Sequence, residues 1–268
     1  NKEFDIFFPI FHGKNGEDGS IQGLLDFLQL PYVGCGIAGS AICIDKEIAK
    51  KICEANGVKV VPYIVYKNFN WQSNKSKSIE EIEKKLGYPL FVKPASLGSS
   101  IGITKAKNRD ELINGMDIGF GYDTKVLVEK GLNVKEYSVS IIGNNSPIAS
   151  EISLFKSLNP DFFDFESKYS KVALSSETPA KLDSETTKII KDKALDIYKF
   201  LEIYGFARVN FFVSDDMFFL NEVNTIPGLD IDGTFFKQWK KSNIEKSKLI
   251  DILVECGFEK FKEKESLK

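Results

Sequence analysis

The sequence predicts a mixed helix and sheet protein of the α/β (α+β) class. Short apolar runs of strand length alternate with segments whose apolar residues recur at helical spacing. Several helical segments begin at a capping residue and end at glycine. The 268 residues, 43% hydrophobic and 28% charged, have an ordinary globular composition. This length suits one large domain or two to three small ones.

The first part of the chain predicts a strand–loop–helix–strand unit. We expect a buried strand over 4–11, a glycine-rich turn over 12–19, a helix over 20–30 and a short apolar piece over 31–39. The first residue is Asn rather than Met, and the strand follows it almost at once. We therefore expect that a segment is missing before it; the alternative is a domain that opens with a strand.

Three capped helices are predicted in the middle of the chain. We expect Asp45 to cap a helix ending at Gly57, and Asn108 with Glu111 to open a helix to about Met116. Between them, Ser78 and Glu81 have the spacing of a capping box for a helix ending at Gly87. The rest is predicted as extended chain at 58–66, a loop at 68–77, and strands at 89–93, 103–106, 125–129 and 137–142.

The last part begins with residues 153–181, which show no sustained period and are expected to form a functional or mobile loop. An amphipathic helix is predicted over 183–203. A hairpin of strands 206–213 and 217–223 follows. The final helix is expected over 243–256, with a charged, frayed tail over 258–268.

Composition excludes several functions. The 36 basic and 38 acidic residues give a net charge of −2, which argues against nucleic-acid binding. No apolar run approaches the roughly 20 residues needed to span a membrane, and no signal peptide is visible. The four cysteines form no CxxC pair and predict free, mostly buried thiols in a reducing, cytoplasmic setting. A single His excludes a histidine-rich metal site.

Three groups of residues carry candidate chemistry. In the first, Lys93 ends a strand and a Ser/Gly loop follows over 95–102. Backbone N–H groups, Ser hydroxyls and the lysine charge could bind phosphate there, although this is not a Walker A motif. On its own such a loop is more often an ordinary turn.

The second group is Arg208-x-Asn210 and Glu222-x-Asn224 on the two hairpin strands. Alternation places each pair on one face, and the hairpin brings the pairs side by side. Oxygen ligands of this kind suit Mg²⁺; the alternative is a solvated hairpin edge. The third group, Glu129 to Leu132 with Glu136, could contact a purine and a ribose, or could be surface charge.

Taken together and in this order, these motifs resemble the D-alanine–D-alanine ligase family of the ATP-grasp superfamily, and are also similar to the D-alanine–D-serine ligases of vancomycin resistance. The resemblance spans nearly the whole chain and is carried by HGKNGEDGSIQG (12–23), VGCG with AICIDK (33–46), YPLFVKPASLGSSIGITK (88–105), VLVEKGLNVKEYSVSIIG (126–143), FFDFESKY (162–169), and FARVNFFV with FLNEVNTIPG (206–228).

The resemblance implies an ATP-grasp fold in three parts: 1–44 as the remainder of an N-terminal substrate domain, 45–136 as the central subdomain and 137–268 as the C-terminal subdomain. The ATP contacts that it implies are Lys46, Lys93, Ser99 and Ser100 at the phosphates, Glu129, Lys130 and Leu132 at the adenine, Glu136 at the ribose and Lys168 on the loop 153–181.

The resemblance also implies catalytic and metal-binding residues. Glu222 and Asn224 would hold Mg²⁺ (or Mn²⁺) with help from Asn210. Arg208 would stabilise an oxyanion. Tyr169 and Ser99 would help to close the site, and His12 would lie near the first D-alanine or be a structural partner of a carbonyl.

In the implied reaction the carboxylate of a first D-amino acid attacks the γ-phosphate of ATP to give an acyl phosphate. The amine of a second amino acid then attacks that carbonyl. The partners are therefore small molecules, D-alanine and ATP, and the product is a peptidoglycan precursor. The resemblance also implies a homodimer.

The sequence departs from the family at three places. Asn210 stands where Asp is usual, which removes one negative charge. Residues 229–234 (LDIDGT) replace a Thr/Ser stretch that helps to hold the carboxylate of the second substrate. Asp230 and Asp232 would repel it, unless they face solvent and Thr234 takes over. The third departure is the family's first glycine-rich loop and its substrate-anchoring Glu, which we expect to lie in the segment missing before Asn1.

These departures keep three hypotheses open. The first is a D-alanine–D-alanine ligase. The second is the same mechanism with another second amino acid, such as D-serine or a cationic amine. The third is a degenerate member that binds nucleotide, or only a partner protein, without catalysis.

Overall fold

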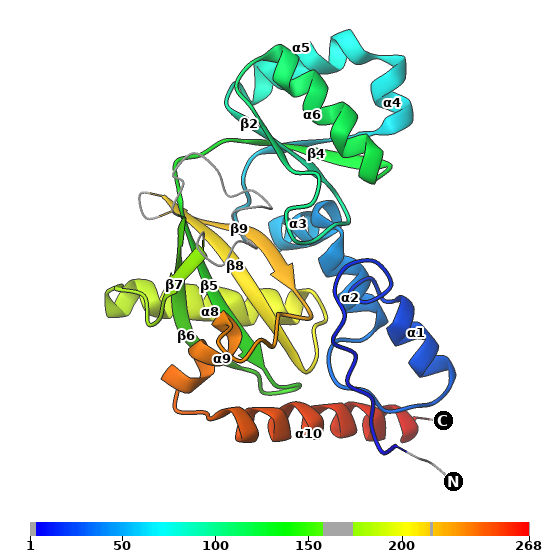
Figure 1. Ribbon diagram of the computed structural model, residues 1–268, viewed down its shortest axis with the longest axis vertical. Helices are drawn as coiled ribbons and strands as arrows, with labels where there is room; N and C mark the ends of the chain where they lie inside the picture. The colour runs from blue at the N-terminus through cyan, green and yellow to red at the C-terminus, as the bar shows by residue number, and fades with distance from the viewer. Residues whose placement is uncertain (1–3, 158–173, 215–216, 268) are drawn as a thin grey trace.

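A computed structural model describes residues 4–157, 174–214 and 217–267, and within them two antiparallel sheets occupy different parts of the molecule (Figure 1). The smaller sheet has the order β1-β4-β2-β3, with β1 at Tyr63–Lys67, β2 at Leu90–Pro94, β3 at Thr104–Ala106 and β4 at Lys125–Lys130. The larger sheet has the order β7-β6-β5-β8-β9, with β5 at Lys135–Ile142, β6 at Ile148–Ser157, β7 at Leu174–Glu177, β8 at Phe206–Ser214 and β9 at Met217–Asn224.

Helices cover one face of the smaller sheet. They are α4 (Asn68–Ser73), α5 (Lys75–Lys85) and α6 (Arg109–Tyr122), and α5 and α6 lie together above the strands in Figure 1. Apolar residues of β2 and β4, such as Val92 and Val128, pack there against Ile82 and Leu112. Because side chains alternate along a strand, the opposite face carries Lys93 and Glu129.

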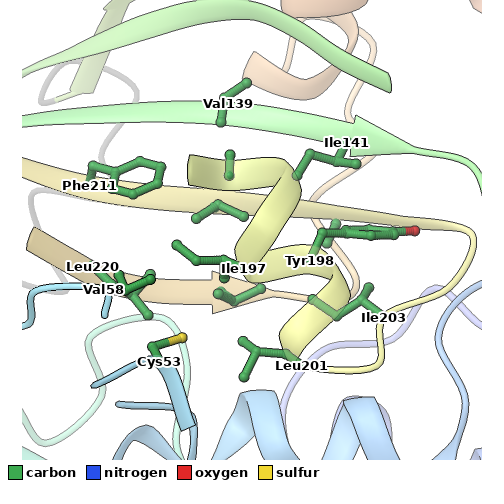
Figure 2. Packing of buried hydrophobic residues seen from close by; sticks show 14 of the residues in the cluster. Cys53, Val58, Val139, Ile141, Ile197, Tyr198, Leu201, Ile203, Phe211 and Leu220 are labelled. Atoms are coloured by element: carbon green, nitrogen blue, oxygen red, sulfur yellow. The ribbon is translucent and has the colours of Figure 1, made fainter. Parts of the chain in front are cut away.

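The larger sheet is built in the same way. Its strands β5 and β8 direct Val139 and Phe211 toward α8 (Ser184–Phe200), where they pack with Ile197 and Tyr198 in the main core (Figure 2). The alternate residues of the same strands face the other way. There they meet α9 (Thr234–Lys241), whose buried Gln238 binds Ser138 and Ser140 of β5, and α10 (Lys246–Glu265) packs alongside α9.

The N-terminal part contributes three helices, α1 (Ser20–Phe27), α2 (Ile37–Ile44) and α3 (Lys46–Ala55). The predicted buried strand over 4–11 is wrong. Among the described residues this segment makes one isolated parallel bridge, between Phe7 and Tyr32, and Phe4 and Ile10 are exposed. An apolar run becomes a strand only where neighbouring chain can pair with its backbone, and here the pairing ends after one bridge.

The predicted helix caps are confirmed at Asp45 and Asn108 but not at Ser78. Asp45 accepts from the amides of Glu47 and Ile48, and Asn108 accepts from the amide of Glu111, so both predicted caps are confirmed. The capping box at Ser78 is wrong, because α5 begins at Lys75 and Ser78 is buried within it. The predicted loop over 68–77 contains α4 and the start of α5.

The final helix was predicted too short, since α10 continues to Glu265 where a frayed tail was expected. The prediction of a loop over 153–181 is wrong at both ends of its described part, because β6 runs to Ser157 and β7 covers Leu174–Glu177. All four cysteines are free and buried, as predicted. None of the helices in the described residues combines the length and the apolar character needed to cross a bilayer.

Candidate active site

Three charged side chains form a buried ion cluster beside the smaller sheet. Glu129 of β4 places one carboxylate oxygen 2.9 Å from Lys50 Nζ and the other 2.5 Å from Lys93 Nζ. Burial alone would raise the pKa of Glu129, but the charges of Lys50 and Lys93 outweigh it and hold the pKa at about 2. The alternative of a surface charge is therefore wrong for Glu129.

The Ser/Gly loop after β2 lies against the start of α3. The backbone N–H of Lys46 donates to Ala95 O at 3.0 Å, and its Nζ donates to Leu97 O at 2.5 Å. Ser99 and Ser100 have φ angles of 56° and 58°, in the left-handed region that non-glycine residues seldom adopt. The structure thus places Lys46 and the two serines at one loop.

The hairpin places its two polar pairs side by side, as predicted. Arg208 lies opposite Asn224, and Asn210 lies opposite Glu222 in the β8–β9 register. Asn210 Nδ2 donates to Glu222 Oε1 at 3.4 Å, and Arg208 Nε donates to Asn210 Oδ1 at 3.2 Å. These residues share the face of the sheet that is opposite α8.

Glu136 joins this group from β5. Its Oε1 accepts from Asn210 Nδ2 at 2.8 Å and from Asn221 Nδ2 at 3.1 Å, and the carboxylate is buried. Glu136 therefore lies beside the hairpin residues, so a ribose hydroxyl at Glu136 would be next to the expected cation.

The orientation of the Asn210 amide limits what it can bind. Carboxylates only accept hydrogen bonds, so the group that faces Glu136 and Glu222 must be the NH₂, and the Asn210 oxygen faces Arg208. Glu222 and Asn224 carry side-chain oxygens, the type of ligand that Mg²⁺ prefers, and the Asn224 oxygen also accepts from the Ile226 amide at 3.0 Å. Asn210 could bind the cation only after its side-chain amide flips, so that the oxygen faces Glu222 in place of the NH₂ group.

The two sheets meet at Lys93. Its Nζ lies 5.7 Å from the centre of the Phe212 ring, and Phe212 is on β8, two residues beyond Asn210. This contact brings the buried ion cluster of one sheet close to the acid and amide residues of the other. The same region contains the loop that carries Ser99 and Ser100.

The N-terminal turn supplies a residue that sequence reasoning missed. Glu17 is buried, accepts from the Gly13 amide at 2.5 Å and lies close to Gly98 of the Ser/Gly loop. Burial raises its pKa; the nearby charges of His12 and Lys46 lower it and Glu222 raises it. The signal for Glu17 is its place in the HGKNGEDG motif, which also contains His12, and the structure leaves His12 exposed.

The remaining predicted residues are placed as follows. Lys130 ends β4 and is exposed, and Leu132, two residues beyond the strand, is half-buried. Lys168 and Tyr169 lie outside the described residues. Asp230 and Asp232 are exposed, while Thr234 begins α9 and its hydroxyl donates to Ser176 Oγ at 3.4 Å.

Two family models match the chain: "D-ala D-ala ligase C-terminus" over residues 52–255 and "D-ala D-ala ligase N-terminus" over residues 1–35. A D-alanine–D-alanine ligase of Caldicellulosiruptor bescii is 42% identical, across 99% of this chain and 73% of its own length. One from Clostridium acetobutylicum is also 42% identical, across 96% and 75%.

Solved structures agree. The D-alanine–D-alanine ligase of Coxiella burnetii has a TM-score of 0.84 at 30% identity, covering 97% of this chain and 71% of its own. The VanG D-Ala:D-Ser ligase of Enterococcus faecalis has a TM-score of 0.86 at 36% identity, covering 94% and 73%. The fold is therefore that of the ATP-grasp ligases. Within that class, the chain belongs to the D-alanine–D-alanine ligase family.

Proposed function

We propose that the protein joins two D-alanine molecules at the expense of ATP, through an acyl phosphate, as a cytoplasmic step of peptidoglycan precursor synthesis. The observation that carries this proposal is the approach of Lys93 and Glu129 to the β8–β9 hairpin, where Phe212 lies 5.7 Å from Lys93 Nζ. ATP lying across this approach would have its adenine at Glu129 and its phosphates at Lys93, Lys46 and the Ser/Gly loop.

The reaction needs charge compensation and an oxyanion site. Lys93 and Lys46 would bind the phosphates and orient the γ-phosphate toward the D-alanine carboxylate. A divalent cation held by Glu222 and Asn224 would neutralise charge on the transferring phosphoryl group. Arg208, half-buried beside Asn210, would stabilise the oxyanion that forms when the second amine attacks the acyl carbonyl.

Phosphate release tests this proposal. We expect release from ATP and Mg²⁺ to depend on D-alanine, and Arg208→Met to reduce the rate about 100- to 1,000-fold, the typical loss for an oxyanion donor. The matched control is Arg109→Met, because Arg109 is the chain's other arginine and lies on α6, paired with Glu83 at the surface. Equal losses in both variants would contradict the role of Arg208.

A second candidate uses the same mechanism with another second amino acid. It is favoured by the similarity to the VanG D-Ala:D-Ser ligase and by the LDIDGT stretch at 229–234. Because Asp230 and Asp232 are exposed, Thr234 at the start of α9 is the better candidate to anchor a carboxylate. A panel of second amino acids, with D-alanine first, would distinguish the two by the product formed.

A nucleotide-binding member without catalysis is the remaining alternative. It is motivated by Asn210, whose NH₂ rather than its oxygen faces Glu222. Nucleotide binding with no D-alanine-dependent phosphate release would favour this alternative over both ligase functions.

A further inference from the structure

Lys50 is a buried cation that the proposed reaction does not use. It lies on α3 with 1% of its side chain exposed, less than the 9% of Lys93. Its ammonium group contacts Glu129 and lies 5.7 Å from the centre of the Tyr63 ring. A charge buried this deeply is costly unless a specific partner compensates for it. The Glu129 carboxylate is the partner that compensates for the charge of Lys50.

The local fold sets the arrangement. Lys46 and Lys50 are four residues apart on α3 and so lie on the same helix face. Lys46 reaches the Ser/Gly loop at Leu97 O, and Lys50 reaches β4 at Glu129. On the sheet, Glu129 lies opposite Phe91 of β2, and Lys93 is two residues further on the same face. One carboxylate is thus shared by cations from a helix and from a strand.

The two cations are not equivalent. Lys93 approaches Phe212 of the other sheet, where phosphate would bind, whereas Lys50 is more deeply buried and contacts the other oxygen of the Glu129 carboxylate. Burial lowers the pKa of Lys50 and the charge of Glu129 opposes that shift. If phosphate draws Lys93 away from Glu129, only Lys50 remains in contact with the carboxylate. Without Lys50 the buried carboxylate would be left uncompensated at that moment.

We propose that Lys50 is a positioning residue that fixes the Glu129 carboxylate as a hydrogen-bond acceptor for the 6-amino group of adenine, and so determines the preference for ATP over 6-oxopurine nucleotides. This inference rests on the proposed function, which places adenine at Glu129. An ionised carboxylate accepts but cannot donate hydrogen bonds. It therefore pairs with a 6-amino group and is repelled by a 6-oxo group.

The test compares dissociation constants for ATP and inosine triphosphate, a nucleotide whose 6-position carries an oxo group. We expect wild-type protein to prefer ATP. Lys50→Met should weaken ATP binding about 10- to 100-fold while changing inosine triphosphate binding less than about threefold, because only the amino group loses its acceptor. Lys50→Gln keeps an uncharged N–H donor, so its affinity for ATP should lie between those of the wild-type protein and Lys50→Met. The matched control is Lys51→Met, since Lys51 is the exposed neighbour on α3 and pairs with Glu47.

A double-mutant cycle separates positioning from folding. In a Glu129→Gln background, Lys50→Met should leave the ratio of the two dissociation constants unchanged, because the ionised carboxylate that Lys50 orients is already gone. Should Lys50→Met alone fail to fold, Lys50→Gln and the double variant, which removes both charges of the pair, give the same comparison.

The outcomes are distinct. If Lys50→Met loses affinity for ATP and for inosine triphosphate equally, or loses affinity for neither, the positioning role is overturned. Failure of the wild-type protein to bind ATP overturns the proposed function instead. A fall in the ATP preference that depends on Glu129 supports the inference.

Discussion

At the scale of the residue, Asn210 decides how the acid groups of the site are held together. Its NH₂ group donates to Glu136 at 2.8 Å and to Glu222 at 3.4 Å. An Asp at this position would add a third carboxylate to the same place. The amide therefore replaces repulsion by two hydrogen bonds, at the expense of one negative charge that a cation would use.

Asn210→Asp is expected to tighten Mg²⁺ binding about 3- to 10-fold and to lower the stability of the cation-free protein by about 1 kcal/mol, because the added carboxylate attracts Mg²⁺ but repels its neighbours. Calorimetric Mg²⁺ titration and urea unfolding in a chelator measure the two effects. Asn221→Asp is the matched control, since Asn221 also donates to Glu136. An equal gain in Mg²⁺ affinity in the control would contradict the assignment.

Glu129 predicts a specific acid sensitivity. Its pKa in the folded protein is about 2, below the usual 4.5, so its ion pairs stabilise the fold fully above pH 4.5. That stabilisation is lost as the pH falls from 4.5 toward 2. Urea unfolding at pH 5 and pH 3 should show a loss on the order of 2 kcal/mol that is absent from the double variant Lys50→Met/Glu129→Gln. An identical loss in both proteins would assign the acid sensitivity elsewhere.

At the scale of the element, the helix α9 is fixed to the larger sheet by one polar side chain. Gln238 is fully buried; its Nε2 donates to Ser138 O at 2.8 Å, and its Oε1 accepts from Ser140 Oγ at 2.5 Å. Ser138 and Ser140 lie opposite Asn210 and Arg208 in the register of β5 and β8. The hydrogen bonds of Gln238 therefore fix α9, which begins at Thr234, to β5, the strand that pairs with β8 and its residues Arg208 and Asn210.

Gln238→Leu should destabilise the protein by about 2 to 4 kcal/mol, because it leaves buried serine groups without partners. Urea unfolding measures this loss. Gln72→Leu is the control, since Gln72 is exposed on α4, and we expect a change within about 0.5 kcal/mol there. A small effect at Gln238 would mean that water replaces the lost contacts.

The elements also mark the limit of sequence-based prediction. Local signals succeeded where a single side chain decides the structure, as at the Asp45 and Asn108 caps, and strand alternation correctly placed Arg208-x-Asn210 beside Glu222-x-Asn224. They failed where tertiary packing decides. The helix α9 follows a Gly–Asp stretch without a capping side chain, and its stability depends on Gln238 and buried Phe235.

The site showed the same limit. The partners of Glu129 could not be predicted, because Lys50 is 79 residues away in the chain and reaches Glu129 only when α3 packs beside β4. Glu17 was missed for a related reason, since its approach to Gly98 of the Ser/Gly loop and its electrostatic interaction with Glu222 arise only in the folded chain. Residue type and spacing identify candidates, whereas burial and pairing assign their roles.

At the scale of the whole molecule, the two sheets contribute different halves of the proposed ATP site. Lys93 and the loop 95–102 belong with the smaller sheet, and Glu222 and Asn224 belong to the larger one. A nucleotide that contacts both would hold the two parts together. We therefore expect nucleotide binding to suppress local unfolding in both parts of the molecule at once.

Hydrogen exchange with ATP and Mg²⁺ tests this expectation. Amides in residues 95–102 and in residues 225–233, beyond the hairpin, should become protected together, and a ligand concentration 100 times the dissociation constant should stabilise the fold by about 2.7 kcal/mol. Lys93→Met should reduce both effects, because it removes a phosphate contact while Lys50 still compensates for Glu129. Lys107→Met, an exposed lysine just after β3, should behave like the wild type. Protection confined to one of the two segments would mean that the nucleotide binds to one part of the molecule and does not bridge the sheets.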